Sequence, residues 1–598
     1  MSDEYPFLDL LKDFDENKSL WLFSEDGVGG HTKAVVNLPR SHCGTTSFVR
    51  LLIAAQTDKL GELDVMKILQ GVKQTQISSG QDAGEFLWYL EENHVEDNHA
   101  TFFNGLAMCA IYGGHLEQFT KEERELIGDM LQATYPIFIR HVRHFNRHYP
   151  NEYLGDLVCA WLIGEWFGMP DEDRKMLLDE FVLLERLWHK NGWGWGEHLS
   201  DTYGCICLDE LSLILLLAKQ LTNEAKKSLQ NLFSELLEID DLFQGGPRVP
   251  AIRQYAFLIP PEGLHYRAMI KPVPKNAMLE HYTPAVGSRL PTCAVPLQTP
   301  TGDAMSVDNS PEVWLPMGAT FYKLGWDKIA TPKKKFSAGS YKIECINGQA
   351  QIYINESIRI GTTEQFPLIP QAEHLTYGLA WQSFPVSVWT PGKEWIYMQW
   401  ETSERDKTYH QPAENKYTGK FNPAITQLTN PPIIGKTYSI AENDNFLILR
   451  VMPMIIRDWQ RCVDRFRIVG KFIECSEIAN TANWKQLQIK LSEHIIYLQC
   501  VQLSCPNEET LLKKQDSYHD WSLIYTQDKI SNKRAIANLW GISFAQVTCE
   551  PEIEFQKEYM GPATEERLSA IVRWHWPKID WQVRINLSDM NNTFYRIQ

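Results

Sequence analysis

Residues 153–190, YLGDLVCAWLIGEWFGMPDEDRKMLLDEFVLLERLWHK, decide how the N-terminal half of the chain folds. On both sides of GMPDED, apolar residues recur at positions i, i+3, i+4 and i+7, which is the period of an amphipathic helix. The glycine and proline between the two runs are the signals expected where one helix ends and the next begins. Helices joined by so short a loop lie antiparallel. The stretch therefore predicts a helical hairpin.

The helical period extends over most of residues 45–238. It predicts further helices in FLWYLEEN (86–93), TFFNGLAMCAIYGG (101–114), ERELIGDMLQATYPIFIRHVRHF (123–145), CLDELSLILLLAKQL (207–221) and KKSLQNLFSELLEI (226–239). A long run of such hairpins forms a bundle, a solenoid or a closed toroid. No sequence repeat of fixed period is present, which disfavours a solenoid built on a consensus motif.

From about residue 313 the apolar period becomes two, as in β-strands. GSYKIECINGQAQIYINESIRIG alternates around an Asn-Gly turn, and FPVSVWT, EWIYMQWET, NFLILRVMPMII, QLQIKLSEHIIYLQCVQL and DWQVRINL continue the pattern. A segment rich in proline and glycine separates the two halves. We predict a helical domain over residues 1–245, a structured linker over 246–312 and a large antiparallel β-sandwich over 313–598.

The composition is that of a water-soluble globular chain, with 44% hydrophobic and 22% charged residues in a total of 598. A net charge of −17 argues against general binding to nucleic acid or anionic membranes. No secretory signal or membrane span is recognisable, and the twelve cysteines lack zinc-ligand spacing. We expect a cytoplasmic protein with reduced thiols, no cofactor and no bound metal. Homodimerisation is left open.

The first candidate site is the entry to a predicted helix in DNHATFFNGLA, residues 97–107. Helix N-termini present N–H donors and a positive field to anions. The amide of Asn98 and the imidazole of His99 would there be able to grip a carboxylate. The structural alternative is that Asp97 or Asn98 only caps the helix.

The second candidate is NGWGWGEHLSDTYG, residues 191–204. Its titratable groups Glu197, His198 and Tyr203 cluster before an apolar helix, and Trp193 and Trp195 are flat platforms of the kind on which sugar rings stack. The alternative is a packing corner between helices, with the aspartate at position 201 as the cap of the next helix.

Three further segments carry candidate binding or catalytic residues. RHVRHFNRHYP presents Arg143, Arg147 and His148, which indicate either a solvated basic face or a surface that holds an anionic ligand. Its three histidines share a helical face, but no carboxylate or cysteine joins them at helical spacing, so a metal site is disfavoured. PPEGLHYRAM places Tyr266 in the predicted linker, and QAEHLTYGLAWQS places His374 at a strand start in the β domain.

The order of helices, linker and β-sandwich resembles polysaccharide lyases whose prototype is an (α/α) toroid packed on an antiparallel β-sandwich. DNHATFFNGLA resembles the Asn-His helix-entry motif of heparinase II/III-like and related alginate lyases. GWGEHLSDTYG resembles their Glu-His-Ser…Tyr segment, with Tyr203 in the place of the catalytic tyrosine, and PTGDAM (300–305) resembles the Gly-Asp that opens the β half. The resemblance implies an N-terminal incomplete (α/α) toroid, with His198 and His374 near the reacting groups.

The chemistry that this resemblance implies is β-elimination from a uronate-containing saccharide. Asn98, with Arg147, would neutralise the substrate carboxylate as negative charge develops. His99 or Tyr203 would remove the proton, and Tyr203 would return one to the leaving oxygen. Trp193 and Trp195 would form the stacking floor, with Glu197 and Tyr266 as further substrate contacts.

Other functions remain open. A glycoside hydrolase would need two carboxyl groups about 5–10 Å apart, for which Glu197 or Asp201 could pair with Asp156 or Glu96. An intracellular biosynthetic eliminase or cyclase would reuse the scaffold on another small molecule. A carbohydrate-binding protein without catalysis would tolerate loss of the titratable groups. A lyase product carries a new conjugated double bond that absorbs in the near ultraviolet, whereas a hydrolase product does not.

Overall fold

In the computed structural model the chain forms two compact units, one helical and one of β-strands. The helical unit contains the described residues within Met1–Arg248 and Pro261–Phe336, and the β unit those within Val249–Pro260, Ser337–Glu414 and Gln427–Gln598. The described residues are 13–24, 38, 40–56, 58–243, 247–254, 260–261, 266–271, 273–274, 312–313, 317–345, 348–366, 383–391, 394–404, 407–409, 436–453, 459–471, 473–504, 507–526, 535–559, 566–587 and 594–597.

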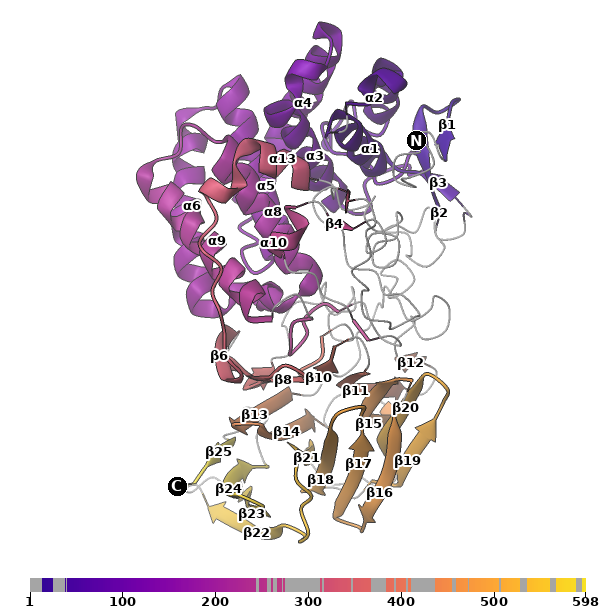
Figure 1. Ribbon diagram of the computed structural model, residues 1–598, viewed down its shortest axis with the longest axis vertical. Helices are drawn as coiled ribbons and strands as arrows, with labels where there is room; N and C mark the ends of the chain where they lie inside the picture. Colours follow the sequence, from indigo (N-terminus) through magenta and orange to yellow (C-terminus); the bar gives the residue numbers. More distant parts are fainter. Residues whose placement is uncertain are drawn as a thin grey trace. The chain divides into compact units, whose positions relative to one another are not determined.

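The helical unit follows a small N-terminal sheet with a series of helices (Figure 1). The sheet pairs β1 (Phe14–Asp15), β2 (Leu20–Ser24) and β3 (Arg40–His42). The helices are α1 (Gly44–Gln56), α2 (Val65–Lys73), α3 (His99–Gly114), α4 (Lys121–Arg143), α5 (Pro150–Phe167), α6 (Asp171–Asn191), α7 (Trp193–Gly196), α8 (Asp201–Leu217), α9 (Asn223–Phe243), α10 (Tyr266–Met269) and α13 (Gly318–Leu324). Across the described residues, no helix is both long and apolar enough to span a membrane.

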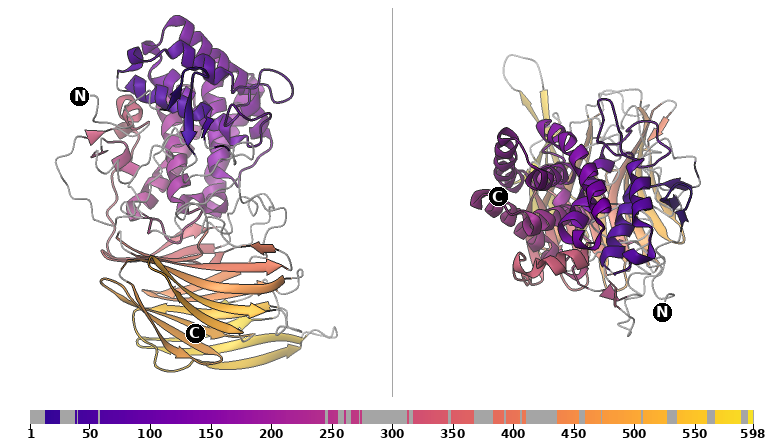
Figure 2. Two further views of the ribbon diagram at one scale, coloured as in Figure 1. Left: turned by 90° about the vertical axis from the view of Figure 1, so that its right-hand side faces the viewer. Right: turned by 90° about the horizontal axis from the view of Figure 1, so that it is seen from above.

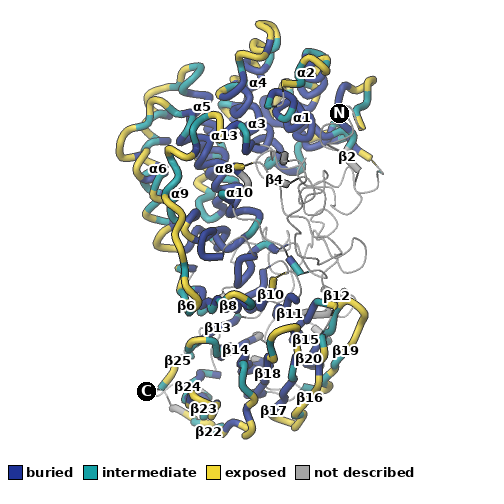
Figure 3. The backbone as a smooth tube through the Cα atoms, in the orientation of Figure 1, coloured by how far each residue is buried: buried dark blue, intermediate teal, exposed yellow. Residues whose placement is uncertain are grey.

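The longer helices alternate between an inner and an outer layer. Helices α3, α5 and α8 are buried around almost their whole circumference, whereas α4, α6 and α9 expose one face (Figure 3). The inner helices pack side by side in the order α1, α3, α5, α8, and α4 packs on α3 and α5 while α9 packs on α6 and α8. A helix that is apolar all round has to be covered by others, so the outer layer completes the burial of the inner one. This alternation confirms the predicted helical hairpins.

The predicted helix over residues 86–93 is wrong. Phe86 and Tyr89 each form an isolated β-bridge, with Gln76 and Cys43, and all four side chains from Phe86 to Tyr89 are buried. The segment is extended, and the Leu87 N–H donates to the Thr75 carbonyl at 2.8 Å while the Leu90 N–H donates to His42 at 3.0 Å. It runs as a buried connection that leads into the start of α3.

The β unit is antiparallel in every described pairing. Its strands are β6 (Gly339–Cys345), β7 (Gly348–Ile354), β8 (Arg359–Thr363), β9 (Gln365–Phe366), β10 (Val386–Thr390), β11 (Glu394–Glu404), β12 (Lys407–Tyr409), β13 (Lys436–Glu442), β14 (Asn445–Pro453), β15 (Trp459–Gly470), β16 (Glu474–Asn480), β17 (Trp484–Lys490), β18 (Ile495–Gln502), β19 (Glu509–Lys514), β20 (Tyr518–Thr526), β21 (Ala535–Ser543), β22 (Glu552–Tyr559), β23 (Glu566–Trp576), β24 (Ile579–Asn586) and β25 (Phe594–Arg596). Two short strands, β4 (Val273–Pro274) and β5 (Glu312–Val313), pair outside this unit.

Strands β6 to β25 of the β unit form three stacked sheets (Figure 2). The nine-stranded sheet runs β19-β20-β15-β11-β10-β8-β7-β6 with β12 beside β11, the seven-stranded sheet β16-β17-β18-β21-β14-β13-β9, and the four-stranded sheet β22-β23-β24-β25. One apolar core joins the first two sheets and a second joins the seven-stranded sheet to the four-stranded one. Along β14, Phe446 and Ile448 enter the first core while Leu447 and Leu449 enter the second. The alternation of period two therefore buries both faces of the central sheet.

The α-then-β fold class is confirmed, and the hairpin around the Asn-Gly turn is present, with Cys345 of β6 opposite Gly348 of β7. Most of the predicted linker, residues 246–312, lies outside the described residues, so its boundaries stay predictions. The cysteines that the structure describes form no disulfide, and all of them except Cys549 are buried.

Candidate active site

The N-terminal ends of three inner helices meet at one end of the helical unit. Asn98 is the N-cap of α3, Glu152 lies in the first turn of α5, and Glu197 opens the short 3-10 helix η4 (Glu197–Leu199) that leads into α8. The Nδ2 of Asn98 donates to Oε1 of Glu152 at 3.2 Å, and the Asn151 N–H donates to Oε2 of Glu197 at 2.8 Å. The first two candidate segments of the sequence, 97–107 and 191–204, are therefore bonded to adjacent residues at the start of α5, Glu152 and Asn151.

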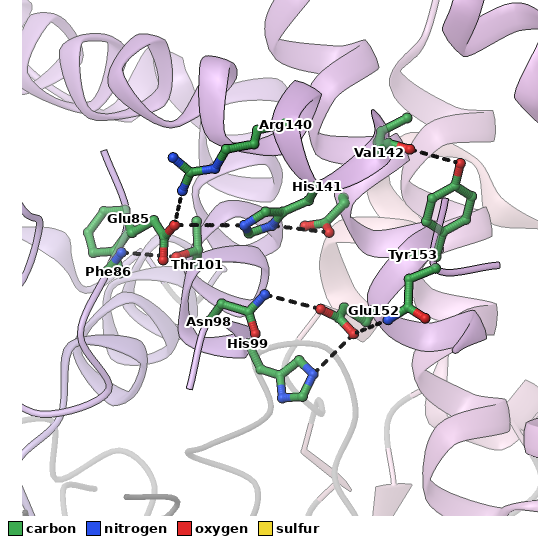
Figure 4. Close-up of polar contacts among 12 residues, drawn as sticks. Glu85, Phe86, Asn98, His99, Thr101, Arg140, His141, Val142, Glu152 and Tyr153 are labelled. Atoms are coloured by element: carbon green, nitrogen blue, oxygen red, sulfur yellow. Dashed lines mark hydrogen bonds and ion pairs between the residues drawn. The ribbon is translucent and has the colours of Figure 1, made fainter. Parts of the chain in front are cut away.

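The imidazole of His99 is held between two carboxylates (Figure 4 shows the side of Glu152). Its Nδ1 lies 2.7 Å from Oδ1 of Asp97, and its Nε2 lies 3.4 Å from Oε2 of Glu152. The ring also stacks on Tyr149, with 5.3 Å between centroids. The His99 side chain keeps 19% of its surface exposed.

Glu152 is the point on which the polar side chains converge. The amides of Asn98 and Asn146 donate to its two oxygens at 3.2 and 3.3 Å, and His99 faces one of the same oxygens. Asn98 makes no capping bond to its own helix, whereas Asp97 accepts from the His99 N–H at 3.0 Å. The capping task therefore falls to Asp97, and the amide of Asn98 is left to bind a carboxylate.

The charges of this cluster follow from burial and pairing. Burial by itself lowers the pKa of His99, but the charge of Asp97, followed by Tyr149 and Glu152, outweighs it and raises that pKa well above its usual range. Burial works to raise the pKa of Glu152, yet the facing His99 imidazolium and its hydrogen bond hold it below the usual value. At neutral pH, His99 is therefore a cation and Glu152 an anion.

A second imidazole–carboxylate pair lies behind the first (Figure 4). Nδ1 of His141 lies 3.3 Å from Oδ2 of Asp156, one turn after Glu152 on α5, and Nε2 lies 3.8 Å from Oε1 of Glu85. Glu85 also pairs with the Arg140 guanidinium. Burial opposes the charge of His141, but Asp156 and Glu85 raise its pKa to about 10. In this second group the carboxylates of Glu85 and Asp156 are buried, whereas the Arg140 side chain is partly exposed.

The tyrosine predicted to be catalytic lies in the first turn of α8. The Tyr203 N–H donates to Oγ of Ser200, the N-cap of that helix, at 3.2 Å, and the side chain is 9% exposed. Asp201 was the expected cap. Instead, its Oδ1 accepts from the Arg248 N–H at 2.9 Å. His198 is buried, and its carbonyl oxygen accepts from Nη1 of Arg248 at 3.1 Å.

The first tryptophan of NGWGWG is a packing residue as the structure places it. The Trp193 ring is fully buried, stacks on Trp188 at 4.9 Å between centroids, and donates to Glu235 at 3.2 Å. No face of this ring is open to a ligand. The backbone of Trp195 lies in α7, but its side chain is outside the described residues.

The basic residues at the end of α4 are paired within the helical unit. Arg147 binds Glu180 through Nε at 2.7 Å, and Nη2 of Arg143 lies 2.9 Å from Oδ1 of Asp173. His148 is half-buried, with its backbone against Gly194. A shallow hollow on the outer side of α4 is lined by Tyr135, Pro136, Ile139, Arg140, Arg143, His144 and Asp173.

Tyr266 is fully buried and donates to Oδ1 of Asp209 at 2.5 Å, which ties α10 to α8. His374 lies outside the described residues. In the described part of the chain, no three histidine, cysteine, aspartate or glutamate side chains are arranged to hold a metal ion.

Sequence reasoning missed Asp97 as a partner of His99, and it missed Glu152 and Arg248 altogether. Glu152 stands in the acidic first turn of α5, a position that helix stability alone would favour, so nothing in the sequence marked it. Arg248 stands in a Gly- and Pro-rich stretch with no period to assign it a partner.

Comparison with known proteins gives a structural likeness that is weak. No protein-family model matches this sequence, and no curated protein matches it. Among solved structures, the chain is similar to heparinase III at 9% identity, over 90% of this chain and 82% of that one, with a TM-score of 0.39. A score this low supports no argument, so the site rests on the contacts described above.

Proposed function

We propose that the protein is a carbon–oxygen lyase that acts on a uronate-containing saccharide by β-elimination. One observation carries the proposal: Asn98 and His99 converge on a single carboxylate, that of Glu152. Both side chains predicted to grip a substrate carboxylate contact a carboxylate of the chain itself, and this supports the proposal. A uronate carboxylate that took the place of Glu152 would meet the Asn98 amide and the His99 imidazolium.

The charge of His99 indicates which residue neutralises the substrate carboxylate and which one transfers the proton. Because its pKa is raised well above the usual range, the imidazolium suits neutralisation of the carboxylate better than removal of a proton. The base and acid role then falls to Tyr203. Tyr203 lies in the first turn of α8, directly after the segment that contains Glu197 and His198.

In the proposed reaction, the proton on the carbon next to the substrate carboxylate passes to the Tyr203 phenolate. The electron pair that is released forms the new carbon–carbon double bond as the bond to the bridging oxygen breaks. Tyr203 then returns the proton to that leaving oxygen. Asn98 and His99 stabilise the negative charge that builds up on the carboxylate between these events.

The test is a screen of uronate-containing oligosaccharides, read by absorbance of the unsaturated product in the near ultraviolet. In a substrate that reacts, His99→Ala and Tyr203→Phe should each lower kcat/KM by about 100-fold or more, the usual scale for loss of a proton-transfer or charge-stabilising group. His189→Ala is the matched control, since His189 is exposed on the outer helix α6.

Other outcomes decide against elimination. New reducing ends without absorbance would identify a hydrolase, for which the carboxyl pairs named above would be the groups to mutate. Full activity in both His99→Ala and Tyr203→Phe would rule out the proposed site. Reaction of a small acid instead of a saccharide would favour the biosynthetic alternative.

A further inference from the structure

The segment that carries His198 and Tyr203 is fastened by one buried arginine. Nη1 of Arg248 donates to the carbonyl oxygens of His198 at 3.1 Å and Ser200 at 2.7 Å. The Arg248 backbone N–H binds Oδ1 of Asp201 at 2.9 Å. One residue thus makes three bonds to residues 198–201, and it is only 2% exposed.

The guanidinium is itself held from the opposite side. Its Nη2 lies 3.5 Å from Oδ1 of Asp240 in α9, and the other oxygen of that carboxylate accepts from the Tyr266 N–H at 2.8 Å. The charge is therefore balanced by Asp240, as a buried cation requires.

The chain leaves space for this contact at Gly204. A Cβ at that position would lie 1.6 Å from Nη1 of Arg248, so any side chain there would displace the guanidinium. The glycine stands in the first turn of α8, where an alanine would favour the helix by about 1 kcal/mol. The close approach of Arg248 explains why glycine occupies this position.

The position of the Arg248 guanidinium beside the first turn of α8 does not favour the stability of that helix. The N-terminus of a helix carries partial positive charge, so a cation beside the first turn of α8 is opposed by the helix dipole. What Arg248 gains there is contact with two carbonyl oxygens in the segment that leads to Tyr203. On the other side of the same segment, Glu197 is bonded to Asn151 at the start of α5.

We infer that Arg248 is a positioning residue, which fixes the backbone of residues 198–204 so that Tyr203 is held in place for proton transfer. The inference rests on the proposed function for the role of Tyr203, but not for the fastening itself. Because Arg248 is buried, we do not expect it to contact the substrate. Its loss should therefore affect the reaction step and leave substrate binding largely unchanged.

The experiment compares Arg248→Met and Arg248→Lys with Arg267→Lys. Arg267 is the matched control because its guanidinium binds Asp241, next to Asp240, at 2.9 and 3.1 Å but fastens α10 and not the 198–204 segment. Hydrogen exchange of the Tyr203 and Gly204 amides should become about tenfold faster or more in the Arg248 variants. In Arg267→Lys these two amides should exchange as in the wild type.

On a substrate that reacts, Arg248→Met should lower kcat by about tenfold or more with KM within about threefold, whereas Arg267→Lys should leave both unchanged. Gly204→Ala should reproduce the kinetic and exchange effects of Arg248→Met, and it provides a second variant if the first does not fold.

Two results would overturn the inference. Unchanged exchange at Tyr203 and Gly204 in folded Arg248 and Gly204 variants would show that the arginine does not fasten the segment. Faster exchange with unchanged kcat would show that the fastening has no part in the reaction. If no uronate saccharide reacts with the wild type, the proposed function fails, while the exchange measurement still decides whether Arg248 holds this segment.

Discussion

The charge of the His99 ring is the property of a single residue on which the site depends most. A histidine that lies between Asp97 and Glu152 gains more from its neighbours in the charged form than it loses by leaving water. A neutral ring carries a single N–H, so it could donate to only one of the two carboxylates, and neither of them would face a cation. His99 should therefore stay protonated through the neutral range.

Replacement of Asp97 by asparagine tests this account. The amide keeps the shape and a hydrogen bond but removes the negative charge that contributes most to raising the pKa of His99. NMR titration of the imidazole should give a pKa in Asp97→Asn at least about one unit below that of the wild type. The other histidine resonances serve as internal references, and an unshifted His99 titration would contradict the charge assignment.

The raised pKa of His99 also makes the free energy of unfolding depend on pH. A histidine whose folded pKa lies above the unfolded value of 6.5 stabilises the folded state fully below that pH. This stabilisation is lost as pH rises through the folded pKa. The free energy of unfolding should fall over that alkaline window in the wild type, and by less in His99→Gln.

At this scale, the sequence predicted the residues that follow from local helix geometry. Asn98 and His99 are adjacent at a predicted helix start, so their place at the N-terminal end of α3 could be foreseen. Glu152 could not, because its approach depends on how α5 packs against α3. Trp193 was predicted to be a stacking platform, a role that the stack on Trp188 does not support.

Helix α8 carries an unusual group for an inner element, the carboxyl of Glu210. This side chain is fully buried, and within the described residues neither of its oxygens has a hydrogen-bond partner. Burial and, after it, the charges of Glu197, Asp209 and Asp156 raise the pKa of Glu210 well above its usual range. The carboxyl is therefore protonated at neutral pH, where the unfolded chain would ionise it.

Glu210→Gln should be more stable than the wild type at alkaline pH. The folded wild type holds a proton that the unfolded chain gives up above about pH 4.5, so its stability falls as pH rises from there towards the folded pKa. Glutamine cannot ionise, so this loss disappears. We expect a melting temperature about 2–5 °C above that of the wild type at pH 8 and a smaller difference at pH 4.

The exposed residue Glu224 on α9 provides the control for that measurement, since Glu224→Gln should shift the melting temperature little at either pH. A Glu210→Gln variant that melts below the wild type at both pH values would mean that the carboxyl has a stabilising partner.

Elements with a strong period were predictable, and those decided by tertiary contacts were not. The hairpin of α5 and α6 follows directly from the pattern in residues 153–190. The segment from Phe86 to Tyr89 is just as apolar, but its backbone pairs with residues far away in sequence. Ser200 caps α8 because Asp201 is drawn to Arg248, a partner that no local rule indicates.

On the scale of the whole molecule, the β unit contains an ion pair between two sheets. Arg450 of β14 and Asp464 of β15 are both fully buried, with 2.6 Å between Nε and Oδ1. Nδ2 of Asn538 in β21 donates to the same carboxylate at 2.7 Å. The pair lies between strands of the seven- and nine-stranded sheets, so it links the two layers that share the first core.

Arg450→Met should lower the free energy of unfolding of the β unit by about 3–5 kcal/mol, because it leaves a buried carboxylate without its cation. The double variant Arg450→Met/Asp464→Leu should recover most of that loss, since no charge then remains unpaired. Chemical denaturation followed by far-ultraviolet circular dichroism measures both.

Lys490→Met is the control for that comparison, as it breaks the exposed pair with Glu474 and should change the free energy of unfolding by less than about 0.5 kcal/mol. If Arg450→Met were as stable as Lys490→Met, the buried pair would not hold the sheets together.

The order of helical and β units could be predicted because the apolar period changes from helix to strand. The stack of three sheets could not, because strand pairing joins residues far apart in the chain. The twenty tryptophans had suggested ligand platforms, yet many serve as core. Ten of them are among the largest fully buried side chains: Trp21, Trp88, Trp161, Trp188, Trp193, Trp395, Trp521, Trp540, Trp574 and Trp581.

The stacked rings of Trp188 and Trp193 have an optical consequence. Two indoles whose centroids are 4.9 Å apart and whose planes differ by 28° couple their electronic transitions, which produces a pair of circular-dichroism bands of opposite sign. Trp193 stands just before the segment of His198 and Tyr203, so this signal comes from the border of the candidate site. The difference spectrum between the wild type and Trp193→Phe would isolate this signal. The couplet therefore reports, without an added probe, whether the structure next to residues 198–204 is ordered.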